Sequence, residues 1–161
     1  MTPDVAPHTS NLEIRIARRA DVPHITRLNA QLGYPESEDV IAYRFRRVRR
    51  VRRDHRVFVA LPGGAEAPST TEPIGWIHVF LDKLLTVGTR AEIGGLVVEE
   101  QWRGRGVGAA LVHAAEQWAK KKGCTQLVVH TNVVRIRAHG FYERCGYQLL
   151  KQSKVYTKEI L

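Results

Sequence analysis

Alternating apolar and polar residues in the first third of the chain predict a strand followed by two helices. Residues 12–17 read Leu-Glu-Ile-Arg-Ile-Ala, which is the two-residue period of a half-buried strand. After Asp21, a residue type that suits a helix N-cap, apolar side chains recur at helical spacing, and they do so again over residues 37–51. Gly33-Tyr34-Pro35 separates the two predicted helices.

The middle of the chain predicts three strands. Residues 56–61, 74–81 and 91–98 are short apolar runs rich in β-branched and aromatic residues. The first two runs are joined by residues 62–73, whose prolines and glycines predict a long hairpin loop. Gly94-Gly95 interrupts the third run, and glycine inside a strand indicates a bulge or a close approach of another backbone.

The second half predicts a long helix, a strand, a short helix and two closing strands. The long helix has one apolar face and ends in three lysines followed by Gly123, a pattern typical of a helix C-terminus. The five elements cover residues 106–122, 126–131, 136–145, 147–150 and 155–160. No repeat or linker divides them, so we expect one α/β domain over residues 12–161, preceded by a flexible tail at residues 1–11.

Composition places the chain among ordinary globular domains, with an excess of positive charge. The 161 residues are 43% hydrophobic and carry a formal net charge of +9. No apolar run approaches the roughly 20 residues of a membrane span, and no secretory signal is recognisable, so we expect a cytoplasmic protein with no membrane partner. Cys124 and Cys145 form no disulfide framework, and no metal-binding spacing occurs.

A glycine-rich turn at residues 103–109 (Arg-Gly-Arg-Gly-Val-Gly-Ala) lies between a predicted strand and a predicted helix. Free amides and the positive dipole end of a helix N-terminus favour phosphate, and the two arginines add charge. The turn also matches a dinucleotide fingerprint, but the next strand lacks the acid that would hold a ribose. The other alternative to a phosphate site is that the glycines only allow the chain to turn and bind no ligand.

Read as Arg-x-x-Gly-x-Gly, this turn resembles the pyrophosphate loop of the GNAT superfamily of N-acetyltransferases. Residues 92–98 (Glu-Ile-Gly-Gly-Leu-Val-Val) resemble the family's fourth strand, and residues 138–147 resemble its later Ala-x-x-Phe-Tyr-Glu-x-x-Gly-Phe/Tyr helix. The resemblance covers residues 12–160. It implies a mixed, mostly antiparallel sheet of six or seven strands, splayed between strands 4 and 5 and flanked by about four helices, and a homodimer.

The resemblance also implies a cofactor and its contacts: acetyl-CoA as co-substrate, with no metal. The pyrophosphate would lie on Arg103, Gly104, Arg105, Gly106, Val107, Gly108 and Ala109. The pantetheine arm would pair with the backbone of Leu96, Val97 and Val98, one of whose amides would hydrogen-bond the thioester carbonyl. Asn132, Arg135 and Tyr142 are further candidates for cofactor contacts.

Two side chains are candidates for proton transfer. Tyr142 matches the family's general acid for the leaving thiolate, and a tyrosine that only packs the helix onto the sheet is the alternative. Glu92 resembles the glutamate that serves as general base in histone acetyltransferases; a water chain, or a glutamate that only pairs with arginine, are the alternatives. Glu99 and Glu100 are expected to be solvated. Cys124 and Cys145 lack a nucleophile arrangement.

Eight arginines concentrate the positive charge between residues 44 and 56. With Asp54 they contribute +7, and they are Arg44, Arg46, Arg47, Arg49, Arg50, Arg52, Arg53 and Arg56. They form either the solvated side of a helix or a surface that selects an acidic acceptor or partner, and they would repel strongly cationic acceptors. No aromatic residues interleave and no nucleic-acid-binding motif occurs, so the sequence does not favour nucleic acid.

The sequence therefore leaves two candidate functions. The first is an N-acetyltransferase that transfers an acetyl group from acetyl-CoA to a primary amine of a small molecule or a protein by direct attack in a ternary complex. The second is a CoA-binding or basic interaction module that has the fold but little turnover.

Overall fold

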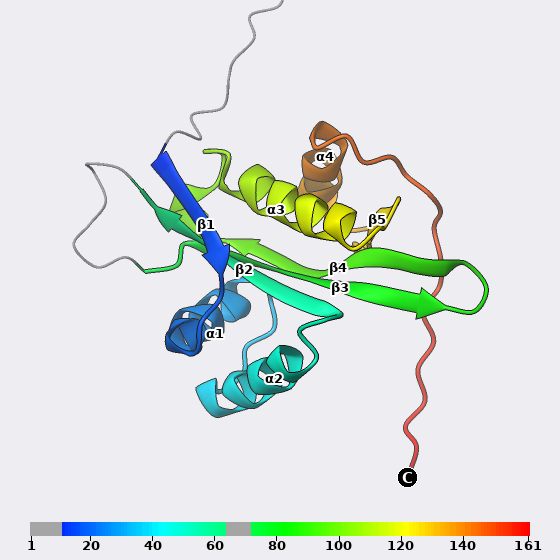
Figure 1. The fold of residues 1–161 in the computed structure, drawn as a ribbon, viewed down its shortest axis with the longest axis horizontal. Coiled ribbons are helices and arrows are strands. Elements are labelled where there is room, and N and C mark those ends of the chain that lie inside the picture. Colours follow the sequence, from blue (N-terminus) through cyan, green and yellow to red (C-terminus); the bar gives the residue numbers. More distant parts are fainter. Residues whose placement is uncertain (1–10, 64–71) are drawn as a thin grey trace, which may run out of the picture. The chain divides into compact units, whose positions relative to one another are not determined.

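The structure, a computed structural model, describes residues 11–63 and 72–161 (Figure 1). The chain divides into two compact units, Met1–His130 and Thr131–Leu161. The predicted tail, except for its last residue, and most of the predicted loop at residues 62–73 lie outside the described residues.

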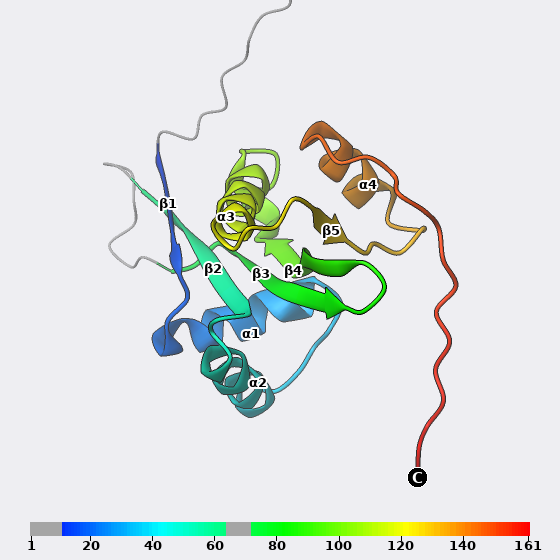
Figure 2. The ribbon, with the colours of Figure 1, turned by 45° about the vertical axis from the view of Figure 1, so that its right-hand side comes forward.

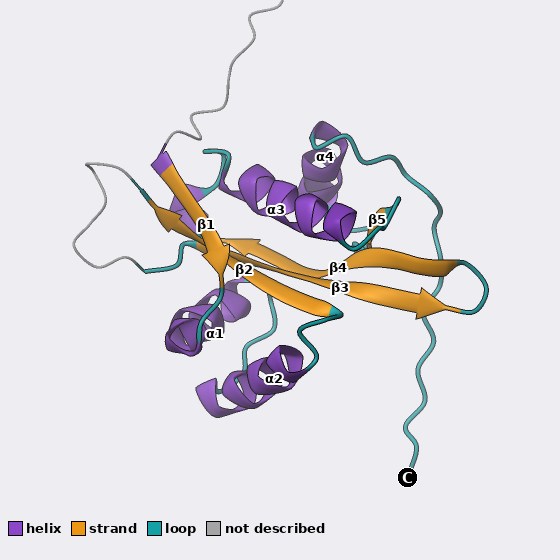
Figure 3. Ribbon diagram, in the orientation of Figure 1, coloured by secondary structure: helices purple, strands orange, loops and turns teal. Residues whose placement is uncertain are grey.

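The first unit is built around a mixed sheet in the order β1-β2-β3-β4-β5. The first four strands pair antiparallel, whereas β5 pairs parallel with β4. Figure 3 shows the strands as one layer. Their bounds are β1 Leu12–Ile16, β2 His55–Pro62, β3 Gly75–Leu84, β4 Gly88–Val98 and β5 Leu127–Val129.

Helices cover both faces of this sheet. Figures 1 and 2 show α1 (Val22–Gln31) and α2 (Glu38–Arg50) on one face and α3 (Val107–Lys121) on the other. Two short 3-10 helices, η2 (Arg19–Asp21) and η3 (Glu100–Trp102), precede α1 and α3. The predicted strands and α-helices of this unit are confirmed, with boundaries shifted by up to three residues, whereas the two 3-10 helices were not predicted.

The apolar stripes of the helices form the core on either side of the sheet. On the α1–α2 face, Leu28 and Phe45 pack in one cluster with Val59, Trp76 and Val97 of the sheet. On the other face, α3 buries a stripe that comprises Val107, Leu111, Val112, Ala115, Trp118 and Ala119. Alternate residues of each central strand therefore serve opposite halves of the core.

A β-bulge interrupts the pairing of β3 with β4. The register shifts between His78 and Val79, where β4 carries Gly94 as an extra residue. A Cβ atom on Gly95 would stand 2.8 Å from the buried ring of Trp76, so only glycine fits there without a shift of the ring. The predicted bulge is confirmed, and packing explains its second glycine.

Asp21 is a buried acid that joins β1 to the start of α1. Arg15 donates to both of its carboxylate oxygens at 2.8 Å, and the Arg18 amide donates to Oδ2 at 2.6 Å. Asp21 does occupy the N-cap position of α1, but its side chain makes no capping hydrogen bond there, because it is already committed to Arg15 and Arg18. Asp21 therefore forms a buried ion pair with Arg15 and does not cap the helix with its side chain.

The second unit contains one helix, α4 (Ile136–Arg144), as predicted. The two predicted closing strands, residues 147–150 and 155–160, are wrong: residues 147–161 form neither helix nor strand. Their apolar side chains, such as Leu149 and Val155, are exposed. A strand needs a hydrogen-bonding neighbour, and α4, the only element of this unit, offers no sheet edge. Within residues 11–63 and 72–161, the sheet accordingly has five strands, where six or seven were expected.

The Asp21 ion pair makes stability depend on pH. Burial alone would raise the pKa of Asp21, but the hydrogen bonds from Arg15 and the Arg18 amide outweigh burial and hold it below its ordinary value. A lowered folded-state pKa stabilises the fold fully above the unfolded pKa near 3.9. This stabilisation is lost as the pH falls through the folded-state pKa.

We therefore expect Asp21→Asn to lower the free energy of unfolding by about 2 kcal/mol at pH 7, because charge-assisted hydrogen bonds to a buried acid are lost. At pH 3 the difference from the wild type should be smaller. Urea unfolding at both pH values measures it, with exposed Glu13→Gln as the control. An equal loss at both pH values would contradict the assignment.

Candidate active site

The strands β4 and β5 separate part of the way along β4. They pair only from Ala91–Ile93 to Leu127–Val129. Beyond Ile93, β4 continues to Val98 and pairs with β3 on its other edge. In the described part of the chain, Leu96, Val97 and Val98 therefore have one edge without a strand partner, which suits hydrogen bonding to an extended ligand.

The glycine-rich turn connects the end of β4, through η3, to the start of α3. Gly104 and Gly106 have φ values of 73° and 82°, the left-handed region in which glycine is unstrained. Gly106 is the N-cap of α3, and the first α-helical bond runs from the Ala110 amide to its carbonyl. The amides of Val107, Gly108 and Ala109 are thus the unpaired donors of a helix N-terminus.

The two arginines of the turn are held in different ways. The Arg103 Nε atom donates to the Val98 carbonyl at 3.0 Å, which fixes the turn to the end of β4. The Arg105 guanidinium lies over the Trp102 ring, 5.2 Å from its centre. Both side chains are exposed. Free amides, a helix dipole and two exposed cations in one turn make an anion site.

Glu99 joins α1 to this turn, a contact that the sequence did not reveal. Arg27 donates to one carboxylate oxygen of Glu99, and Gln31 Nε2 donates to the other at 2.6 Å. Burial alone would raise the pKa of Glu99, but the hydrogen bonds from Arg27 and Gln31 outweigh burial and hold this pKa below its ordinary value. The expectation of a solvated Glu99 is wrong, because the side chain is only 14% exposed.

Glu92 lies on β4 opposite Phe80, on the sheet face that α1 and α2 cover. Its side chain is 16% exposed. One carboxylate oxygen is 3.9 Å from Arg90 Nη2 and the other is 3.9 Å from His130 Nδ1. Glu92 therefore has weak ion-pair contacts and a carboxylate that is not fully engaged.

Two histidines occupy the same face beside the bulge. His55 Nδ1 is 3.0 Å from His78 Nε2, and both rings pack on Phe80. Burial lowers the pKa of His78 to about 4, helped by the nearby His55, and burial also lowers the pKa of His55. Sequence reasoning missed this pair, although the alternation of Trp76, His78 and Phe80 on one strand face was the available signal.

The second unit carries the other predicted site residues. Tyr142 contacts the rings of Phe141 and Tyr147, and burial raises its pKa to about 12. Asn132 is exposed, and its Oδ1 atom accepts from the Val134 amide at 3.2 Å. Arg135 is the exposed N-cap residue of α4.

Within the described residues, no group of three or more His, Cys, Asp or Glu side chains is placed to hold a metal ion. Searched over the same residues, none of the helices has the length and apolar character needed to cross a membrane.

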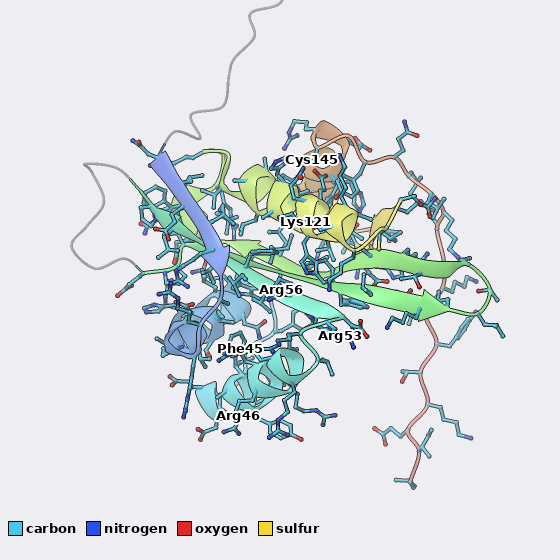
Figure 4. All side chains as sticks on the ribbon, in the orientation of Figure 1. Phe45, Arg46, Arg53, Arg56, Lys121 and Cys145 are labelled. Carbon is cyan, nitrogen blue, oxygen red and sulfur yellow. The ribbon has the colours of Figure 1, made fainter. Side chains whose placement is uncertain are left out.

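Of the eight arginines between residues 44 and 56, all but Arg56 are exposed and lie on α2 and the turn that follows it, whereas Arg56 is on β2 and partly buried. In Figure 4, Phe45 points from α2 toward the sheet and Arg46 lies on the opposite side of the helix. Arg44 pairs with Glu36 at 2.8 Å. Arg46 also lines a shallow groove of about 880 Å³ between α2 and the start of α1, which Glu38 and Asp39 line as well. That groove is of mixed charge.

Comparison with known proteins identifies the family. The family model described as "Acetyltransferase (GNAT) family" matches residues 23–147. The chain is 32% identical over 81 residues to an aminoglycoside N(6')-acetyltransferase type 1 of Stenotrophomonas maltophilia, covering 48% of this chain and 53% of that protein. It is 30% identical over 95 residues to N-alpha-acetyltransferase 30 of Saccharomyces cerevisiae, covering 59% and 53%. The chain thus spans about half the length of these relatives.

The fold is also that of a solved acetyltransferase. An aminoglycoside N-acetyltransferase, AAC(6')-Iy, in complex with CoA superposes with a TM-score of 0.79 at 19% identity, over 99% of this chain and 100% of that chain. An identity this low supports the fold alone. Together with the family model, which matches more than half of the chain, it shows that this chain belongs to the GNAT acetyltransferase family.

Proposed function

We propose that the chain is an N-acetyltransferase that transfers an acetyl group from acetyl-CoA to a primary amine by direct attack in a ternary complex. The observation that carries the proposal is the continuity of the free edge of Leu96–Val98 with the anion site at residues 103–109. An extended pantetheine arm with a pyrophosphate at its end needs these two features in this order.

The turn supports binding of the pyrophosphate through backbone and charge. The amides of Val107, Gly108 and Ala109 would donate to phosphate oxygens, and the helix dipole would favour their negative charge. Arg103 and Arg105 would add charge-assisted hydrogen bonds. Side chains at Gly104 and Gly106 would disturb this surface, because both backbones are left-handed.

The free edge supports orientation of the thioester. An amide of Leu96, Val97 or Val98 would donate to the thioester carbonyl and stabilise the oxyanion that forms as the amine attacks. Asn132 and Arg135 are proposed to contact the cofactor as well.

A homodimer and a cytoplasmic location also stay predictions.

Tyr142 is the proposed acid for the leaving thiolate. Because its pKa is raised to about 12, the hydroxyl stays protonated at neutral pH and can donate. Its pKa exceeds that of an ordinary thiol near 8.5, so the proton is expected to stay largely on the tyrosine oxygen while the thiolate accepts a hydrogen bond. The role is therefore one of stabilising the thiolate.

Glu92 is the side chain proposed to meet the amine. An amine with a pKa near 10 is an ammonium at neutral pH, and a partly engaged carboxylate attracts it. Both acceptor classes remain possible for this site: the relatives are named for an aminoglycoside in one case and for an N-alpha amine in the other. The arginines of α2 would disfavour the more cationic acceptors.

Release of free thiol from acetyl-CoA in the presence of neamine, spermidine and a short peptide with a free N-terminus tests the proposal. We expect acetyl-dependent turnover with at least one of these amines. Calorimetry with acetyl-CoA separates the two functions, since binding without turnover on any amine would favour an interaction module with the fold.

Gly106→Ala tests the pyrophosphate site with a matched control. Gly106 has φ 82° and Gly123, at the end of α3, has φ 78°, so alanine is about equally strained at both positions. Both variants should lose about 1 kcal/mol of stability. Only Gly106→Ala should weaken acetyl-CoA binding, by at least tenfold in calorimetry, and equal affinities in the two variants would reject the site.

Tyr142→Phe tests the hydrogen bond to the thiolate. Turnover should fall by about 10²-fold with little change in the affinity for acetyl-CoA, because the hydroxyl acts only as the thiolate forms. Since the pKa of Tyr142 is about 12, wild-type turnover should show no loss from tyrosine ionisation up to about pH 10. Unchanged turnover in the variant would leave Tyr142 a packing residue.

A further inference from the structure

The bulged glycine of β4 leaves an opening, here called the window, over the partly buried histidine His78. Gly94 is exposed, yet a Cβ atom built on it would stand 3.2 Å from His78 Nδ1 and 3.2 Å from the edge of the Phe80 ring. The missing side chain therefore opens a path from solvent to the Nδ1 atom of an imidazole that is otherwise largely enclosed. Any other residue at position 94 would cover that atom.

The other nitrogen of the same ring is already paired. His78 Nε2 is 3.0 Å from His55 Nδ1, a hydrogen-bond distance. The chain of atoms thus runs from the window at Gly94, through both nitrogens of His78, to His55 at the beginning of β2. The Phe80 ring supports this arrangement, since His55 stacks on it and His78 packs against it at a tilt.

Resting on the proposed function, we propose that His78 and His55 form a proton relay that removes the proton of the acceptor ammonium at the glycine bulge. The window lies on the strand that would present Leu96–Val98 to the thioester, two to four residues away along β4. It also lies on the sheet face of Glu92, two residues earlier. A site for the amine nitrogen beside Gly94 would therefore be adjacent to both groups.

The relay moves one proton through three transfers. The ammonium N–H proton passes to His78 Nδ1, the proton on His78 Nε2 passes to His55 Nδ1, and the proton on His55 Nε2 passes to water. The freed electron pair of the amine forms the N–C bond, and the electrons of the breaking C–S bond remain on the CoA sulfur. As that bond breaks, the attacking nitrogen releases its second proton to water, which leaves the neutral amide, and the CoA thiolate takes up a proton from water after release. Both imidazoles end as the opposite neutral tautomer and return through proton exchange with water.

The charges around the pair are consistent with this role. A relay imidazole must keep one lone pair free, and the lowered pKa values of both rings keep them neutral at pH 7. The carboxylate beside His55, Asp54, is engaged by Lys83 at 2.8 Å. Along the same strand face, Arg90 is bonded to Asp82, and Glu92 stands between Arg90 and His130.

The relay divides the roles of His78 and Glu92. A carboxylate that only attracts the ammonium lowers its KM, whereas the group that takes the proton raises kcat. His78 is then the catalytic residue, and His55, which acts through it, is a positioning residue. Glu92→Gln should mainly raise the KM of the amine, and His78→Asn should mainly lower kcat.

The pH profile of turnover is the decisive experiment. With the relay intact, the ammonium is productive, so kcat/KM for total amine should change little between pH 6 and pH 9. In His78→Asn and His55→Asn only the free amine reacts, so kcat/KM should fall about 10³-fold at pH 7 and rise about tenfold per pH unit toward the amine pKa near 10. His113→Asn, an exposed histidine of α3, is the matched control.

The variant Gly94→Ala tests the window without changing either histidine. A methyl group over His78 Nδ1 should lower kcat at least tenfold and leave the affinity for acetyl-CoA unchanged. Wild-type rates and pH profiles in the histidine variants, or unchanged kcat in Gly94→Ala, would overturn the relay.

Nuclear magnetic resonance of the imidazoles keeps the inference testable in the wild-type protein. Both rings should be neutral at pH 7, and acetyl-CoA should shift the His78 resonances but not those of His113. Acetyl-CoA that binds in calorimetry without any shift at His78 would overturn the relay, even if none of the probe amines is acetylated. A protein that does not bind acetyl-CoA would instead refute the proposed function.

Discussion

The candidate site depends on β4 being longer than its pairing with β5. β3 holds β4 along its whole length, so the strand stays extended, but β5 ends after three paired residues. Among the described residues, Leu96–Val98 thereby have β3 on one edge and no strand partner on the other. The turn at residues 103–109 follows directly and is tied back to Val98 by Arg103, so the open edge and the anion site keep a fixed order.

The glycine bulge of β4 is the second feature on which the candidate site depends. Gly95 must be small because the Trp76 ring lies where its Cβ would be, and Gly94 is small where an exposed position lies over His78. Both glycines therefore leave room for β3 side chains on the same sheet face, Gly95 for the core residue Trp76 and Gly94 for His78. In a strand of regular pleat, two consecutive residues would point to opposite faces, whereas the bulge brings both to one face.

The sequence predicted the elements whose signals are local. The helices follow from apolar periodicity and from glycines at their ends, and the bulge follows from Gly94-Gly95 inside a strand. The closing strands failed because an alternating pattern shows which residues would share a face but not whether an edge is available to pair with. The pairs Arg27–Glu99 and His55–His78 could not be predicted, because 72 and 23 residues separate their members, and only strand register and helix docking bring them together.

The positive charge on the surface of α2 is separate from the side chains proposed to take part in catalysis. Its arginines are exposed on the side of the helix away from the core, and exposed charges are screened beyond about 8 Å at physiological salt. Such a surface changes how often a charged acceptor or partner arrives, and the effect weakens as salt increases. The groups proposed to act on the proton and the thioester lie on β3 and β4 and are partly buried, so water screens their electrostatics less. Selection of an acceptor by charge and the proposed catalysis at the bulge are therefore separable, and ionic strength should alter the first while leaving the second unchanged.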